Sequence, residues 1–187
     1  MKKTIILISL TMIIISCKAQ QTIPLEKLIE YRDSQSDIPN GAYLQDVNSL
    51  LNKYIGTWKG TNNNKNYTFI LTKVKRNIRG VFIDELLIRY LITSTTGTVI
   101  EDTRNLTDTD PLVIEGDYIS ANKKYYVLNY FGRNSKCGQS GEVFISTTSD
   151  NQLKLFLATS QDMINGKKCA TVAEQILPTK SILLTKQ

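Results

Sequence analysis

The chain has 187 residues and contains no histidine. Without an imidazole it lacks the Ser-His-Asp and Cys-His arrangements of hydrolases and the common histidine ligands of zinc and iron. Cysteine is scarce, with three residues, and glycine and proline, with 10 and 4, are too few for a collagen or a low-complexity chain. In contrast, a hydrophobic content of 41% at this length suits a single globular domain with a buried core.

The N-terminus combines two lysines, a short apolar run over residues 4–16, and a cysteine at position 17. The run is shorter than the about 20 apolar residues that cross a bilayer, so it predicts a signal peptide over residues 1–16. Ile14-Ile15-Ser16-Cys17 resembles the lipobox of bacterial lipoproteins, which implies that Cys17 is lipidated and becomes the first residue of the mature protein. The alternative is an ordinary secretory signal cut after Ala19, although Lys18 fits poorly just before such a cut.

A lipidated N-terminus predicts where the protein acts. The lipid would hold the protein in the cell envelope, at the outer membrane, and the absence of acidic residues just after Cys17 favours the periplasmic face.

Removal of Lys2 and Lys3 lowers the net charge from +6 to +4, a value too mild to indicate nucleic acid as a partner. The densest basic cluster, residues 73–79, fits a solvated turn between strands, with anionic lipid or an acidic ligand as the alternative. We expect a monomer that contacts the membrane through its lipid.

Two cysteines, Cys137 and Cys169, remain for the folded domain. An even pair in an oxidising compartment predicts a disulfide. Two free thiols or a metal pair are the competing interpretation, and two cysteines without histidine make a poor metal site. We therefore expect a disulfide, no metal and no other cofactor.

The sequence after Cys17 changes in character near residue 42. Residues 17–41 are polar and predict a flexible tether, with at most a turn or two of helix at residues 25–30. A short amphipathic helix is expected next, from apolar residues that recur at helical spacing: Leu44, Val47, Leu51 and Tyr54. Asp46 is its predicted N-cap and Gly56 its stop.

After Gly56 the apolar residues alternate with polar ones in short runs, separated by clusters of Asn, Ser, Thr and Gly that are typical of turns. This pattern predicts that residues 42–187 form one all-β domain, an antiparallel barrel of about 8–10 strands preceded by the short helix. Residues 86–92 and 125–131 are apolar on both faces of their predicted strands. Such strands need cover on one side and a packed or ligand-filled interior on the other.

Gly56-Thr57-Trp58, with a helix before it and a strand after it, resembles the Gly-x-Trp motif that opens the first strand of lipocalins and related calycin barrels. That resemblance implies that Trp58 plugs the closed end of the barrel and that a basic residue near the last strand, Lys180 or Lys186, stacks on it. A simple role for Trp58 as a core aromatic is the alternative. The side chains that would line a ligand-filled interior are Trp58, Tyr67, Phe69, Tyr90, Tyr126 and Phe131.

A second resemblance covers more of the chain. Cys17-Lys18-Ala19-Gln20, residues 46–60 and Tyr67-Thr68-Phe69 are similar to a family of small lipoproteins of unknown function from Bacteroidota. That resemblance implies an envelope location and a fold class. It does not indicate any activity.

Candidate catalytic residues are few. Asp84 and Glu85 are adjacent on a predicted strand and point to opposite faces, so they cannot flank one bond as glycosidase carboxylates do. Asp108 and Asp110 could hold calcium, but they lack the glycine and the distal glutamate of a dedicated loop, and a solvated loop is the better interpretation. We therefore expect a protein that is not an enzyme.

Two functions remain. The first is a lipid-anchored, lipocalin-like binding module that takes a small apolar or envelope-derived ligand in its barrel. The second is an interaction or inhibitor lipoprotein with a solid barrel, which binds another envelope protein through a loop such as residues 132–141. An interior filled by the aromatic side chains would argue against the first.

Overall fold

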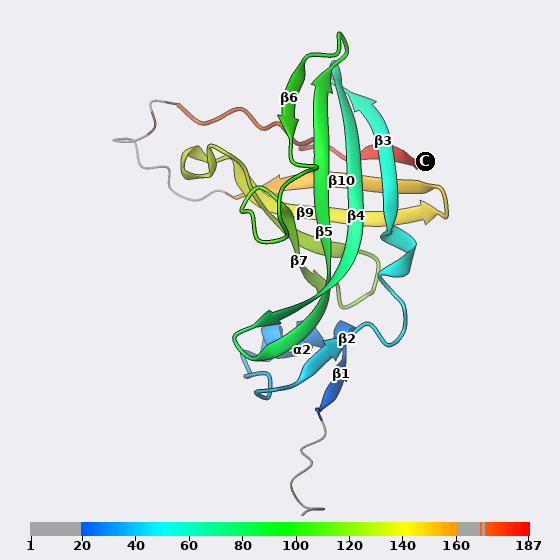
Figure 1. The fold of residues 1–187 in the computed structure, drawn as a ribbon, viewed down its shortest axis with the longest axis vertical. Coiled ribbons are helices and arrows are strands. Elements are labelled where there is room, and N and C mark those ends of the chain that lie inside the picture. Colours follow the sequence, from blue (N-terminus) through cyan, green and yellow to red (C-terminus); the bar gives the residue numbers. More distant parts are fainter. Residues whose placement is uncertain (1–19, 161–168, 170) are drawn as a thin grey trace, which may run out of the picture.

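The computed structural model describes residues 20–160, 169 and 171–187, so the predicted signal peptide and the lipidation site Cys17 lie outside the described residues. Its centre is a closed antiparallel barrel of eight strands (Figure 1). The strands follow one another around the barrel in chain order: β3 (Gly56–Asn62), β4 (Lys65–Ile78), β5 (Val81–Ser94), β7 (Ile114–Ile119), β8 (Tyr126–Phe131), β9 (Ser140–Ser149), β10 (Gln152–Thr159) and β11 (Ile182–Lys186). Pairing of β11 with β3 and of β5 with β7 closes the circle. The predicted all-β antiparallel barrel is confirmed.

Tight turns join the first three barrel strands. Asn63 and Asn64 connect β3 to β4, and Arg79 and Gly80 connect β4 to β5, all four with positive φ angles. Two-residue loops with this geometry match the twist of antiparallel strands, and asparagine and glycine adopt it most readily. The turn that the asparagine-rich sequence predicts after β3 is therefore present.

The segment predicted as a tether is packed against the barrel over its described part. It forms β1 (Thr22–Pro24), the 3₁₀ turn η1 (Leu25–Lys27) and the helix α2 (Leu28–Ser34). Strand β1 pairs in parallel with β2 (Tyr43–Gln45), which in turn pairs with β5. Ile23 and Leu25 are buried in the core. The prediction of a flexible tether is therefore wrong for residues 22–34, because two apolar side chains and one strand pairing are enough to dock this short segment.

The helix predicted around Leu44 to Tyr54 is also wrong in position. Leu44 lies in strand β2, and only Asn52–Tyr54 form a helical turn, the 3₁₀ element η2. The Asp46 carboxylate accepts hydrogen bonds from the backbone of Leu50 and Leu51, at 2.7 and 3.1 Å, and so holds a loop. Ser49 in this loop has a φ of 54°, which interrupts any helix. The helix that precedes the barrel is α2 instead.

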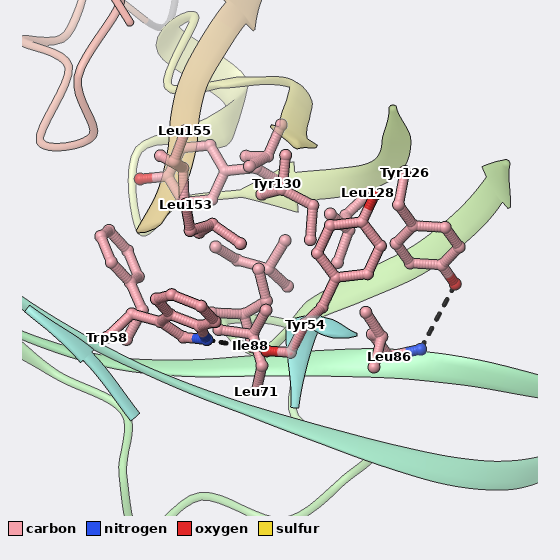
Figure 2. Close-up of a cluster of buried hydrophobic side chains, with 14 of the residues drawn as sticks. Tyr54, Trp58, Leu71, Leu86, Ile88, Tyr126, Leu128, Tyr130, Leu153 and Leu155 are labelled. Atoms are coloured by element: carbon pink, nitrogen blue, oxygen red, sulfur yellow. Dashed lines mark hydrogen bonds between the residues drawn. The ribbon is translucent and has the colours of Figure 1, made fainter. Parts of the chain in front are cut away.

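The interior of the barrel is filled with apolar and aromatic side chains (Figure 2). Tyr67 stacks on Phe69 with ring centres 5.8 Å apart, and Phe69 meets Tyr90 at 6.3 Å. Tyr54 and Tyr126 stack at 6.3 Å. Rings in such contact exclude solvent and contribute large buried areas to the core.

Two smaller elements lie outside the barrel wall. Strand β6 (Val99–Asp102) pairs with β5 near its C-terminal end, at residues 91–93. The 3₁₀ turn η3 (Ser135–Cys137) lies between β8 and β9. Within the described ranges, no helix has the length and apolar character needed to cross a bilayer.

Candidate functional site

One end of the barrel is closed around Trp58. The indole is fully buried, and its Nε1–H donates a hydrogen bond of 2.7 Å to the carbonyl oxygen of Tyr54 in η2. The ammonium group of Lys186, on the last strand, lies 5.2 Å from the centre of the indole, within range of a cation–π interaction. The basic partner implied by the lipocalin resemblance is therefore Lys186, and not Lys180.

Gly56 explains the glycine of the Gly-x-Trp motif. A Cβ at this position would lie 2.9 Å from Cε of Lys186, and the φ of 133° is one that other residues rarely adopt. The missing side chain leaves room for Lys186 to cross the strand and reach the ring of Trp58. The Gly-x-Trp motif therefore has a structural role, because it allows Lys186 to pack on Trp58 at the closed end of the barrel.

The six residues predicted to bind a ligand divide into two groups. Trp58, Tyr67, Phe69, Tyr90 and Tyr126 are each at most 3% exposed and form part of the continuous core. Phe131 is 56% exposed and does not face the interior. The first five residues pack against one another in the core, and Phe131 lies on the surface. The five buried rings fill the interior, which argues against a ligand in the barrel, although Phe131 takes no part in this packing.

The opposite end of the barrel carries a cross-linked lid, which we define as residues 132–139 and 171–178. The predicted disulfide between Cys137 and Cys169 is present. Backbone and side-chain hydrogen bonds join the two segments: Ala173 N to Cys137 O at 2.8 Å, Gln139 Nε2 to Glu174 O at 2.9 Å, and Gln175 Nε2 to Gly138 O at 2.6 Å. The loop at residues 132–141 is therefore held in place by hydrogen bonds and the disulfide.

An ion pair ties the lid to β6. Arg133 donates two hydrogen bonds, both of 2.7 Å, to the carboxylate of Glu101. The Glu101 side chain is 7% exposed whereas that of Arg133 is 63% exposed, so the guanidinium is held in place at the surface. Behind this pair, burial and the nearby Glu101 carboxylate raise the pKa of Tyr90 and of Tyr130, so both phenols stay neutral.

Four exposed apolar residues lie in or next to the lid, or next to the strand that it contacts, along the chain. Phe131 directly precedes the lid, Val172 belongs to it, and Val99 and Ile100 directly precede the lid-bound Glu101. Their exposed fractions run from 40% to 66%. We call these four residues, with Arg133, the lid surface. Figure 1 shows the lid segments (olive and orange) reaching the side of the barrel on which β6 lies.

A second feature is a cleft of about 270 Å³ in the outer wall of the barrel. We call it the wall cleft, and it is lined by Tyr125, Phe144, Ser146, Thr148, Lys154, Phe156 and Ser181. Phe144 and Phe156 are cross-strand partners on β9 and β10, and their parallel rings stack with centres 5.0 Å apart. Tyr125 meets Phe144 edge to face at 6.3 Å.

The wall cleft adjoins a second cavity of about 300 Å³, which we call the lysine pocket. Its lining residues are Lys53, Thr147, Thr148, Ser149, Asp150 and Lys186, so Thr148 belongs to both cavities. Lys53 lies 4.9 Å from the ring centre of Tyr54, in the same way as Lys186 lies over Trp58. Two aromatic rings of the closed barrel end therefore position the two ammonium groups.

The wall cleft is not among the sites predicted from the sequence. Its signal was present, because the strand alternation places Val143 and Ile145 inward and therefore Phe144 outward. Phe156 between Leu155 and Leu157 follows the same rule. What the sequence did not show is the register, which sets the two rings opposite each other.

The acidic pairs do not form a common site. Asp84 accepts hydrogen bonds from the Tyr43 hydroxyl and the backbone of Asp46, at 2.6 and 3.0 Å, while Glu85 faces Arg76 at 3.0 Å. The two carboxylates therefore point to different partners, as predicted.

The loop that carries Asp108 and Asp110, considered above as a calcium site and interpreted as solvated, forms contacts within the protein. Asp108 pairs with Arg89, and the Asp110 carboxylate accepts a hydrogen bond of 2.9 Å from the backbone of Leu112. Each carboxylate thus has a partner within the protein.

The basic cluster at residues 73–79 is largely engaged inside the molecule. Lys73 pairs with Asp46 at 3.3 Å, and Arg76 contacts both Glu85 and Glu115. Lys75 lies 3.8 Å from the ring centre of Tyr43. These contacts favour the interpretation of the cluster as part of a strand hairpin.

A closed meander, a filled interior and a cross-linked lid together define a small, solid β-barrel protein. The chain belongs to a family of unknown function, DUF6705, whose profile matches residues 1–187. No curated protein and no solved structure matches the chain. The expected membership of a family without a known activity is thus confirmed.

Proposed function

We propose that the protein is a lipid-anchored interaction protein of the bacterial cell envelope, and not an enzyme, whose solid barrel presents the lid surface to another envelope protein. The lid surface carries this proposal. It combines an exposed aromatic, three exposed aliphatic side chains and an arginine. Aromatic residues and arginine are enriched in protein interfaces. Exposed apolar groups of this kind often mark interaction sites.

The rigidity of the lid supports the same function. Arg133 is fixed by two hydrogen bonds to a buried carboxylate. Hydrogen bonds join the two lid segments, and the disulfide ties Cys137 of the first segment to Cys169, just before the second. A surface that is already ordered loses less conformational entropy when it binds, so more of the contact free energy is retained.

The chemistry of the lid indicates the kind of partner. Arg133 and Lys136 are exposed, while the carboxylate of Glu101 is buried beneath the guanidinium. The complementary surface is an apolar patch bordered by carboxylates, which would pair with the two cations. The filled interior supports a protein partner over a small ligand carried inside the barrel.

The arrangement of the chain suits an anchor at Cys17. Figure 1 shows β1, the first described strand, and β6, which is tied to the lid, near opposite ends of the molecule. A lipid on the chain before β1 would leave the β6 end directed away from the membrane. The resemblance to lipoproteins of Bacteroidota and the non-acidic residues after Cys17 support the periplasmic face of the outer membrane. We expect the protein to act there as a monomer.

Site-specific photo-crosslinking in cells tests the proposal. A photoreactive amino acid at Phe131 or Val172 should give an adduct of one discrete mass, because both positions belong to the lid surface. Val47 and Ile78 serve as matched controls, since they are exposed apolar residues outside the lid surface, at 48% and 40%. Cys17→Ser should move the protein from the membrane to the soluble fraction.

A second variant shows whether the lid surface itself binds the partner. Phe131→Glu should abolish the adduct formed from Val172, whereas Val47→Glu should leave it unchanged. Adducts of equal yield from all four positions, or none from either lid position, would contradict the proposal.

A further inference from the structure

We propose that the wall cleft and the adjoining lysine pocket form a binding site for an acidic oligosaccharide. This site is separate from the lid surface and shares no residue with it. It would give the protein a second contact in the envelope, with a glycan.

The rings of the wall cleft provide the first part of the argument. Phe144 and Phe156 stand on neighbouring strands with an interplanar angle of 6°, and Tyr125, 39% exposed, lies beside them. An aromatic surface of this kind contacts the C–H face of a pyranose ring, which is apolar although the ring edge carries hydroxyls. A patch made only for an apolar side chain or an acyl chain needs no polar lining.

The hydroxyl groups of the cleft supply that polar lining. Ser146, Thr148 and Ser181 reach the same cavity as the three rings. The hydroxyls of Ser146 and Ser181 have no hydrogen-bond partner among the described residues, while Thr148 donates to Gln152 at 3.2 Å. Each hydroxyl can accept as well as donate, so together they match the hydroxyl edge of a sugar.

Charge determines which class of sugar fits. Lys154 lines the wall cleft, and Lys53 and Lys186 line the adjoining pocket. None of these three lysines forms an ion pair with a carboxylate in the part of the chain that the structure describes. Asp150 is the one carboxylate among the residues that line the two cavities in the described structure. A neutral glycan would leave this local excess of positive charge uncompensated, whereas carboxylates or phosphates on the sugar would pair with it.

The two cavities together suit more than one sugar unit. Thr148 lines both, so an occupant of the aromatic cleft can continue directly into the lysine pocket. The first unit would stack on the rings near Lys154, and the next would place its acidic group near Lys53 and Lys186.

Calorimetric titration of the full-length protein, purified from membranes in detergent, tests the proposal. The probes are tetragalacturonic acid and tetramannuronic acid, with maltotetraose and cellotetraose as neutral counterparts. We expect at least one acidic tetramer to bind about 10-fold more tightly than either neutral one, with an affinity that falls as salt is added. Tyr125→Ala and Lys154→Gln should each weaken binding about 5- to 10-fold, the range expected for one aromatic or one charge contact.

Matched variants on the lid surface and lid serve as controls. Phe131→Ala removes an exposed aromatic and Lys136→Gln an exposed lysine, and both should leave the affinity unchanged within twofold. The proposal is overturned if neither acidic tetramer binds, if a neutral tetramer binds as tightly, or if Tyr125→Ala and Lys154→Gln have no effect. Because crosslinking from Val172 does not involve Tyr125 or Lys154, failure of this site leaves the lid proposal open to its own test.

Discussion

Glu85 is a buried carboxyl group whose ionisation is strongly altered by the fold. Its side chain is 4% exposed on β5, and Arg76 and Glu115 lie beside it. Burial, together with the neighbouring Glu115 carboxylate and against the attraction of Arg76, raises the pKa of Glu85 from 4.5 to about 7. The folded protein therefore holds a proton on Glu85 in a pH range where the unfolded chain has released it.

This shift predicts the direction of a pH effect on stability. Between about pH 4.5 and 7 the folded state binds the proton more tightly, so the contribution of Glu85 to the free energy of unfolding falls as the pH rises. Glu85→Gln should flatten this decline, which has an upper limit of about 3–4 kcal/mol, because one pKa unit corresponds to about 1.4 kcal/mol. Urea unfolding of both proteins at pH 5 and pH 8 measures it.

A matched variant separates burial from the loss of one negative charge. Glu115→Gln changes the same ion cluster at a side chain that is 37% exposed, and it should alter the pH dependence far less. Equal effects of the two substitutions would show that burial of Glu85 does not control its ionisation.

At the same scale, the sequence predicted residues whose roles depend on composition or local pattern. The disulfide followed from the number of cysteines and the inferred compartment, and the position of Trp58 followed from a three-residue motif. The wall cleft could not be predicted, because Phe144 and Phe156 meet only through the register of β9 and β10. That register depends on a bulge at the turn between Gln152 and Leu153, which no local pattern indicates.

At the scale of elements, the closure of the barrel depends on a short seam between β5 and β7. The pairing joins only Leu87 to Glu115 and Ile88 to Ile114. Just beyond it, the Tyr126 hydroxyl accepts a hydrogen bond of 3.3 Å from the backbone of Leu86 (Figure 2). The side chain thus extends the ladder where the strand backbone no longer pairs.

Gly116 makes this arrangement possible. A Cβ at this position would lie 2.1 Å from the Tyr126 hydroxyl and 3.0 Å from the backbone oxygen of Leu86. We expect Gly116→Ala to lower the free energy of unfolding by about 1–3 kcal/mol, because the added methyl group overpacks the seam. Because both changes act on one contact, the double variant Gly116→Ala/Tyr126→Phe should lose at least about 0.5 kcal/mol less than the sum of the single losses. Additive losses in urea unfolding would show that the hydroxyl does not occupy this space.

Sequence patterns predicted the barrel elements better than the N-terminal ones. Core side chains recur at every second residue along β4, β5, β8 and β9. In each barrel strand, successive side chains point alternately into the barrel and out of it. Residues 44–54 have helical spacing, but the Asp46 carboxylate and the positive φ of Ser49 form a loop there. The docking of residues 22–34 depends on contacts with strands that are distant in the sequence. The polar composition of this segment does not indicate those contacts.

At the scale of the whole molecule, the filled interior distinguishes this barrel from one that carries a ligand inside. The chain has one tryptophan, Trp58, which is buried at the closed end of the barrel. Its emission is therefore an unambiguous reporter for any polyene fatty acid that enters the interior. Since the core side chains already contact one another, entry would require their separation and the loss of close-packed contacts.

We therefore expect no saturable energy transfer from Trp58 to cis-parinaric acid in the folded protein. The full chain with Cys17→Ser is the appropriate material, because no covalent lipid then competes with the probe. Weak transfer that rises in proportion to probe concentration would reflect surface contact, for example at the lid surface, and Phe131→Glu should reduce it. Saturable transfer at one probe per protein, unaffected by Phe131→Glu, would mean that the aromatic core opens to a ligand. That result would restore the lipocalin-like carrier as the better interpretation of the same fold.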